Sequence, residues 1–148
     1  MTTLSRREEL AVSGAALSGA PWGAAAATGG VAAVADLGLH LITGNIGLSM
    51  LSSPFAFGAM VFFAVAAGGA LLRSRPSRAL QWARRNPWKF ALAPALACAA
   101  VIIPVAMVIG GSGVAGALLS AFWHGLGVFG VTGLAGLMGR RSGSPAAR

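Results

Sequence analysis

Residues 90–139 read FALAPALACAAVIIPVAMVIGGSGVAGALLSAFWHGLGVFGVTGLAGLMG, a stretch without a single aspartate, glutamate, lysine or arginine. A helix that crosses a bilayer needs about 20 apolar residues, so this stretch is long enough for two such helices. The run from Gly110 to Gly113 between them has the composition of a tight turn. We therefore predict spans over about 90–109 and about 115–138. Asn86 is expected to cap the span over about 90–109, with Pro87 at the first helical position of that span.

The N-terminal half has the same apolar character, because residues 10–72 contain one charged side chain, Asp36. Residues from about 50 to 72 predict another span, which stops at Arg73. The remaining span is predicted over about 22–43 and ends at a turn formed by Gly44 and Asn45. A short helix over 5–18 is expected to lie near the inner membrane surface.

The composition agrees with a membrane protein. The chain is 56% hydrophobic and 9% charged, whereas a soluble domain averages about 25% charged residues. A soluble domain with so few polar side chains could not cover its surface. The predicted fold class is therefore all-α, a polytopic integral membrane protein with four transmembrane helices in one domain over residues 1–148.

The basic residues fall in three clusters that flank the apolar stretches: Arg6 and Arg7, the six in the loop 73–89, and Arg140, Arg141 and Arg148 in the tail 139–148. Loops on the cytoplasmic side of membrane proteins carry an excess of lysine and arginine. Four spans place both termini and the central loop on one side, which is where all the basic residues lie. We therefore predict that both termini are cytoplasmic and that the protein is a multi-pass protein of the cell membrane.

The central loop is predicted to contact lipid headgroups or phosphate through its basic side chains Arg73, Arg75, Arg78, Arg84, Arg85 and Lys89. Ser77 can cap a short helix over 78–85, and Trp82 is expected to dip into the headgroups. Direct contact with nucleic acid through the same loop is the less favoured alternative, because no DNA-binding fold fits in so few residues.

Asp36 and His40 are the candidate polar pair of the first span, because a spacing of four residues puts both on one helical face. An ionisable group within the bilayer indicates function by default, here a proton relay or a cation site. The alternative is that Asp36 lies near the outer surface and is hydrated. His124, in the last span, could reach the pair across a helix interface, although no metal-ligand spacing supports a metal site. The favoured interpretation is a histidine that is hydrogen-bonded within the bundle.

The last span carries glycines at every third position: Gly127, Gly130, Gly133, Gly136 and Gly139. A step of three residues drifts around a helix of 3.6 residues per turn, so these glycines permit close approach by more than one neighbour. Two interpretations stay open. The helix lines a pore or forms an oligomer, or it packs within its own glycine-rich bundle.

A glycine pair, the single cysteine and an arginine pair near the N-terminus could each be functional, but each also has a simpler explanation. Gly19 and Gly23 form a GxxxG pair in a chain with 22 glycines. Cys98, the only cysteine, is expected to be a small packing residue. The segment Ser5-Arg6-Arg7, followed by an alanine- and glycine-rich run, is similar to a twin-arginine export signal. Two features argue against such a signal: Glu8 and Glu9 directly follow the arginine pair, and the rest of the chain is predicted to be membrane spans and not a soluble domain for export.

In size, in its alanine- and glycine-rich spans and in its basic segments Arg73 to Lys89 and Arg140-Arg141, the chain resembles the small hydrophobic plasmid-spread proteins of mycelial high-GC bacteria. The resemblance assigns no residue a role. It implies a part in moving plasmid DNA between compartments of the mycelium, beside a DNA translocase. Phage holins, which are small and have several spans and a basic tail, offer a rival resemblance.

No nucleophile, base and orienting group can be assembled from the sequence, and it carries no phosphate-binding loop or metal motif. We therefore predict a protein without catalytic residues, metal or cofactor. The favoured function is a pore or assembly component that forms a homo-oligomer or binds other membrane proteins. The alternative is a small proton- or ion-linked transport protein that uses Asp36 and His40.

Overall fold

The protein was analysed as a computed structural model, which describes residues 5–44, 47–72 and 77–141. Over these residues the chain is helical, with no strand. The elements are α1 (Arg6–Leu17), α2 (Trp22–Ile42), the 3₁₀ turn η1 (Leu48–Leu51), α3 (Ser52–Leu71), α4 (Arg78–Arg85), α5 (Pro87–Val108) and α6 (Val114–Arg141). Four helices are long and apolar enough to cross a membrane, namely α2, α3 with η1, α5 and α6. The predicted all-α fold with four spans is confirmed.

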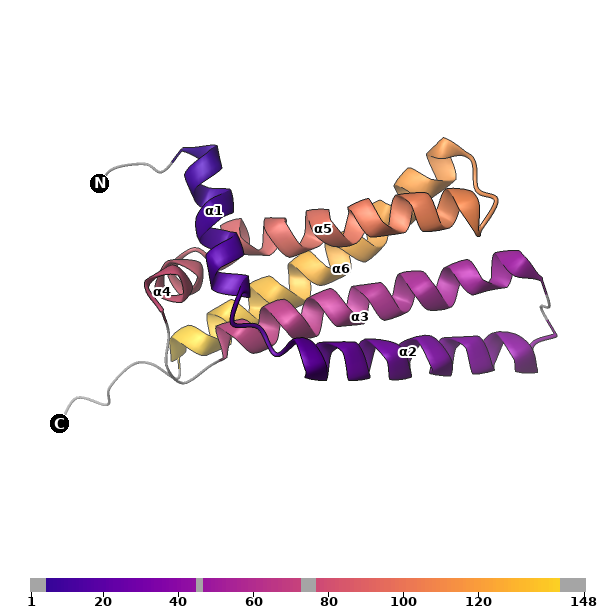
Figure 1. Cartoon of the computed structure of the whole chain (residues 1–148), viewed down its shortest axis with the longest axis horizontal. Helices are drawn as coiled ribbons and strands as arrows, with labels where there is room; N and C mark the ends of the chain where they lie inside the picture. The colour runs from indigo at the N-terminus through magenta and orange to yellow at the C-terminus, as the bar shows by residue number, and fades with distance from the viewer. Residues whose placement is uncertain (1–4, 45–46, 73–76, 142–148) are drawn as a thin grey trace.

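The four long helices run along the long axis of the molecule, whereas α1 and α4 lie across it at one end (Figure 1). The C-terminal end of α6 is at this same end, and the turns at Gly44 and Gly111 are at the other. The short helix predicted over 5–18 is thus present as α1, and α4 covers the range predicted for the helix in the basic loop.

Helix α3 is the centre of the bundle, because it contacts every other described helix. Helix α2 is at the periphery: among the described elements it contacts α3 and η1 and no other. Helices α5 and α6 form a second hairpin that packs on α3. This arrangement leaves most of the surface of α2 outside the bundle.

Local capping explains where the two short helices begin. The Ser5 backbone N–H donates to the Glu8 carboxylate at 2.7 Å while the Ser5 hydroxyl accepts from the Glu8 N–H, a capping box. The Ser77 hydroxyl accepts from the Leu80 N–H at 3.2 Å, so the predicted cap of α4 is present.

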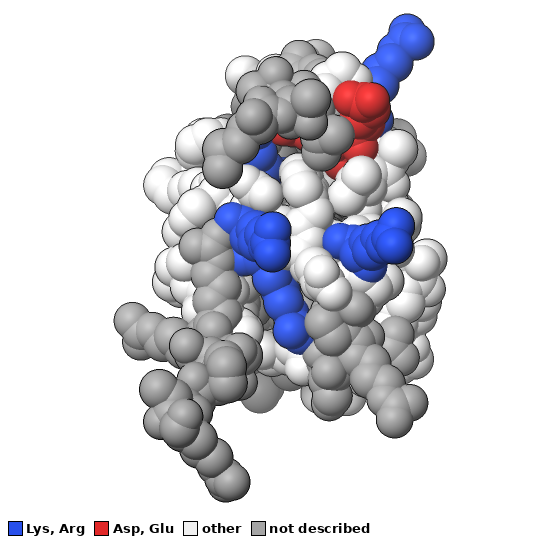
Figure 2. Space-filling model, turned by 90° about the vertical axis from the view of Figure 1, so that its left-hand side faces the viewer, with Lys and Arg blue, Asp and Glu red and all other residues white. Residues whose placement is uncertain are grey.

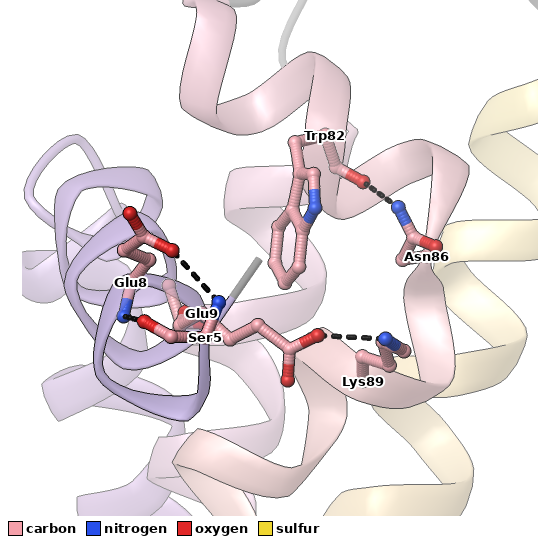
Figure 3. Close-up of polar contacts among 7 residues, drawn as sticks. Ser5, Glu8, Glu9, Trp82, Asn86 and Lys89 are labelled. Carbon is pink, nitrogen blue, oxygen red and sulfur yellow. Dashed lines mark hydrogen bonds and ion pairs between the residues drawn. The ribbon is translucent and has the colours of Figure 1, made fainter. Parts of the chain in front are cut away.

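The predicted cap of α5 is wrong in its chemistry. Asn86 precedes Pro87, which is the first residue of α5, but the Asn86 side chain makes no capping hydrogen bond to this helix. Its amide instead donates to the carbonyl of Trp82 at 3.2 Å, at the end of α4 (Figure 3). The Asn86 side chain therefore caps the C-terminal end of α4 and not the N-terminal end of α5.

Two glycines adopt backbone conformations that other residues avoid. Gly44 follows the end of α2 with φ 73°, and Gly111 lies between α5 and α6 with φ 61°. Both are in the left-handed region that favours glycine. Both turns were predicted from composition; Asn45, the second residue of the first turn, lies outside the described residues.

The core is made mostly of small side chains, which lets the helices approach closely. One cluster joins α1, the start of α2, α3, α4 and the start of α5 around Leu71, Leu80 and Phe90. A second joins α3, α5 and α6 around Cys98, Ile102 and Val128. Cys98 is fully buried in this second cluster, as expected of a packing residue.

Gly19 and Gly23, the GxxxG pair of the sequence, do not form a helix-packing motif, in agreement with a chance occurrence in a glycine-rich chain. Gly19 lies in the turn between α1 and α2, whereas Gly23 is in the first turn of α2. The two glycines therefore do not share the face of one helix. Pro21, which precedes α2, breaks the helical run between them.

Candidate functional site

The candidate polar pair lies on the side of α2 that packs against α3. His40 Nδ1 and the backbone carbonyl oxygen of Asp36 are 2.9 Å apart. Since a carbonyl oxygen can only accept, the hydrogen of this bond is on Nδ1. The same nitrogen is 3.5 Å from the Asp36 carboxylate. Both side chains are half-buried. The predicted pairing on one helical face is therefore realised geometrically.

Ser53 of α3 completes the cluster by donating its hydroxyl hydrogen to the Asp36 carboxylate at 2.9 Å. Sequence analysis missed this residue, because the contact crosses between two helices and joins positions 17 residues apart. A serine hydroxyl in a lipid-embedded helix interface seeks a partner across it. The serines at the start of the second predicted span were therefore the only sequence signal for a contact with Asp36.

The cluster is near the end of the span rather than at its middle. Asp36 precedes the last residue of α2, Ile42, by six positions, which is about 9 Å along a helix. His40 is in the last turn. The carboxylate therefore has a polar partner in α3 and lies within two turns of the C-terminal end of α2.

His124 is not part of this cluster. Its Nδ1–H donates to the carbonyl of Ser120 at 2.7 Å, one turn back in α6. Because α2 and α6 make no contact among the described elements, His124 does not approach Asp36 or His40, and the favoured interpretation of a hydrogen-bonded histidine agrees with the bond to Ser120. No three acidic, histidine or cysteine side chains of the described residues converge as metal ligands would.

The glycine series of α6 faces several partners within the chain. A Cβ placed on Gly127 would lie 2.8 Å from the Met60 sulfur of α3. One placed on Gly133 would enter the ring of Trp88, and one on Gly136 would meet Pro87. The glycines therefore admit α3 and the start of α5 close to the α6 backbone, as the drifting three-residue step predicted.

The two remaining members of the series, Gly130 and Gly139, differ from each other. Gly139 is buried beside the Leu71 carbonyl, which a Cβ would approach to 3.3 Å. Gly130 has open space, with nothing within 4 Å of a Cβ. Intramolecular packing thus accounts for four of the five glycines, and only Gly130 leaves room for another molecule.

The basic end of the molecule is visible in Figure 2, where lysine and arginine side chains gather on the end that carries α1 and α4. Arg78, Arg85 and Lys89 are exposed there. Arg73 and Arg75, which were predicted to contact lipid or phosphate, lie outside the described residues.

Arg84 differs from the other basic residues of the loop. Its Nε–H donates to the Leu71 carbonyl at 2.8 Å. This bond stabilises the C-terminal end of α3, where the last carbonyls lack intrahelical partners and the helix dipole favours a cation. Arg84 therefore ties α4 to α3.

Trp82 and Lys89 connect α1 to the bundle. Trp82 is partly buried against the α1–α3–α4 core, and its insertion into headgroups stays a prediction. The Lys89 ammonium donates to the Glu9 carboxylate at 2.6 Å, between the start of α5 and α1 (Figure 3). Sequence analysis missed this pair, since its members are 80 residues apart.

These features define the protein as a multi-pass membrane protein of four candidate spans with a basic end formed by two short crossing helices. Comparison with protein-family models, with curated proteins and with solved structures gave no match.

Proposed function

We propose that the protein is a non-enzymatic assembly component of the membrane, in which α2 packs against another membrane helix from a second copy of the chain. The observation that carries the proposal is the position and composition of α2. It is the least buried of the four spans, and one exposed face of its first half consists of glycine and alanine.

The outward face follows the helical repeat. Gly23, Ala27, Gly30 and Val34 are spaced at i, i+4, i+7 and i+11, which places them on one side of a helix. All four are exposed. The opposite side carries Gly29, which packs on α3.

Small residues at these positions suit a helix partner better than lipid. Leucine, isoleucine, phenylalanine and valine insert most favourably into a bilayer, and the first three positions of the face have none of them. Glycine and alanine let two helix backbones approach closely, which is how spans associate where lipid is as apolar as the side chains. The proposed assembly surface is thus on α2, since the glycines of α6 mostly serve packing within the chain.

The test is the oligomeric state of a variant that carries Ala27→Leu and Gly30→Leu. The two leucines would hold a partner helix away, so a wild-type oligomer should dissociate to monomers. The matched control is Gly116→Leu on α6, because Gly116 is exposed and a Cβ there reaches only the Ser112 side chain. Subunits would be counted by photobleaching in native membrane fragments and by native mass measurement. A monomeric wild type, or equal dissociation in the control, would contradict the proposal.

A second candidate function rests on the Asp36–Ser53–His40 cluster, which is a half-buried polar group at a helix interface. Ion- or proton-linked transport would use Asp36 as the titrating group, with Ser53 holding it and His40 linking it to the nearby aqueous side. Proton flux in vesicles reconstituted with the wild type and with Asp36→Asn tests this alternative. Equal flux in the two would remove it.

The cellular setting is proposed on sequence grounds. The distribution of arginine supports cytoplasmic termini and a location in the cell membrane. The resemblance to plasmid-spread proteins supports a role in DNA transfer between mycelial compartments, beside other membrane proteins. The alternative proposal is a holin-like phage membrane protein. A translocase gene near the coding sequence would favour the first, and an endolysin gene would favour the second.

A further inference from the structure

We propose that the start of α5 binds one anionic phospholipid, with its phosphate on Arg85 and Lys89 and its two acyl chains in grooves on either side of Leu92 and Leu96. This site is separate from the proposed assembly face on α2, so either can hold without the other.

Two apolar grooves flank one exposed ridge of α5. The first, of about 340 Å³, lies between α1 and α5 and is lined by Glu9, Leu10, Ser13, Lys89, Leu92, Ala93 and Leu96. The second, of about 410 Å³, lies between α5 and α6. Leu92, Leu96 and Ala99 line it from α5, and Phe122, Leu126 and Phe129 line it from α6. Leu92 and Leu96, which are 52% and 62% exposed, belong to both grooves and form the ridge.

A basic hollow lies at the head of this ridge. Arg85, Trp88 and Lys89 line it together with Leu137 of α6, and its volume is about 220 Å³. Lys89 also lines the first groove, so the hollow and the groove share its side chain. Trp88 packs on Phe129 with ring centroids 5.2 Å apart. An exposed tryptophan beside cations is typical of the headgroup level of a bilayer.

Among the described residues Glu9 is the one acidic side chain that lines the hollow or the grooves, and it does not satisfy all the donors of Lys89. Lys89 is 59% exposed, and an ammonium has three donor hydrogens, of which Glu9 accepts one. The start of α5 adds further positive potential, because no side chain caps its free N–H groups. A phosphate therefore meets two cations and a helix N-terminus at this place.

The dimensions fit one lipid of one leaflet. The grooves extend along α5 from Lys89 to Ala99, a separation of ten residues or about 15 Å along a helix. This is half of a hydrocarbon core that is about 30 Å thick. One polar end and two apolar grooves on either side of a single ridge match an amphiphile with two chains. The positive charge selects an anionic headgroup.

Two measurements test the proposal. The first is the affinity for phosphatidylglycerol and for phosphatidylcholine, measured by native mass spectrometry of the detergent-solubilised protein. The variant Arg85→Gln with Lys89→Gln should lose roughly tenfold in affinity for phosphatidylglycerol and little for phosphatidylcholine. The matched control is Arg7→Gln with Arg78→Gln, which removes two exposed cations that line none of these grooves. It should keep the wild-type preference.

The second measurement uses wild-type protein and a phosphatidylglycerol with a photoreactive group in each acyl chain. Crosslinks should concentrate on Leu92 to Ala99 of α5 and on Phe122 to Phe129 of α6. Val131 and Leu134 of α6, which are 53% and 57% exposed and line neither groove, report random contact with lipid. Equal affinity for the two lipids in the wild type, an equal loss in the control variant, or equal crosslinking of Val131 and Leu134 would each overturn the proposal.

Discussion

Gly29 of α2 and Gly58 of α3 lie against each other at the point where these two helices cross. A Cβ on Gly29 would be 2.8 Å from the Gly58 carbonyl oxygen, and a Cβ on Gly58 would be 2.9 Å from the Gly29 carbonyl oxygen. Each glycine thus leaves room for the backbone of the other. Because α2 contacts only α3 and η1 among the described elements, this crossing holds the first span to the bundle.

We expect Gly29→Ala to weaken the attachment of α2. The added methyl group would meet backbone atoms of α3, which cannot rotate away as a side chain can, and overpacking of this kind costs about 1–3 kcal/mol. Gly30→Ala is the matched control, since a Cβ there has nothing within 4 Å. Unfolding in mixed detergent micelles should show a loss of stability in the first variant alone; an equal effect in both would contradict the crossing.

Ser53→Ala should destabilise the α2–α3 interface, because the Asp36 carboxylate loses its interhelical donor. Measured hydrogen bonds between spans average about 0.6 kcal/mol, so the expected loss is of that order. Ser53→Thr keeps the hydroxyl and is expected to keep most of the stability. The same unfolding assay compares the two variants, and a threonine variant as unstable as the alanine variant would point to packing instead of the hydrogen bond.

Gly136→Ala and Gly130→Ala should behave oppositely, although both change a glycine of the same series. A Cβ at Gly136 meets the rigid ring of Pro87, whereas one at Gly130 meets nothing within 4 Å. The first variant should lose about 1–3 kcal/mol of stability. The second should be neutral or slightly stabilising, because alanine is a better helix former by up to about 1 kcal/mol. Thermal unfolding of both variants in the same detergent checks the sign.

The start of α1 should loosen in acid. The Ser5 backbone N–H, and after it the Ser5 hydroxyl, holds the pKa of Glu8 below its ordinary value of 4.5. A lowered pKa in the folded state means that the ionised carboxylate stabilises the cap above pH 4.5 and that this contribution disappears as the pH falls through the folded pKa.

Hydrogen exchange of the first-turn amides of α1, measured on either side of that window, should therefore be faster in acid after correction for the intrinsic rate. Glu8→Gln keeps a capping amide but removes the titrating group, while Glu9 and its pair with Lys89 stay in place. This variant should lose the part of the pH dependence that belongs to Glu8. An unchanged pH profile would rule out the cap as its source.

Reporter fusions test the orientation. A fusion after Arg148 should report a cytoplasmic location, because every basic residue lies at the termini or in the central loop. A fusion at Ser112, in the turn between α5 and α6, should report the outside. A reporter that is outside at Arg148, or inside at Ser112, would reverse the predicted topology.

The sequence by itself determined the number of spans, the turns between them and the start of α4. These features follow from local properties: fifty residues without charge, a glycine that accepts positive φ at Gly111, and the Ser77 hydroxyl that reaches Leu80 three residues on. Each depends on neighbours along the chain, so composition and spacing are enough to predict it.

The tertiary structure alone decided which faces meet. The spans are apolar on all sides, so hydrophobic periodicity does not tell the packed face from the lipid-facing one. The rotation of α2 against α3 decided that Gly29 meets Gly58 and that Ser53 reaches Asp36. The position of α4 against the C-terminal end of α3 decided that Arg84 binds the Leu71 carbonyl. Helix association in a bilayer depends on close fit and on single hydrogen bonds across the interface, and these arise only when residues far apart in the chain come together.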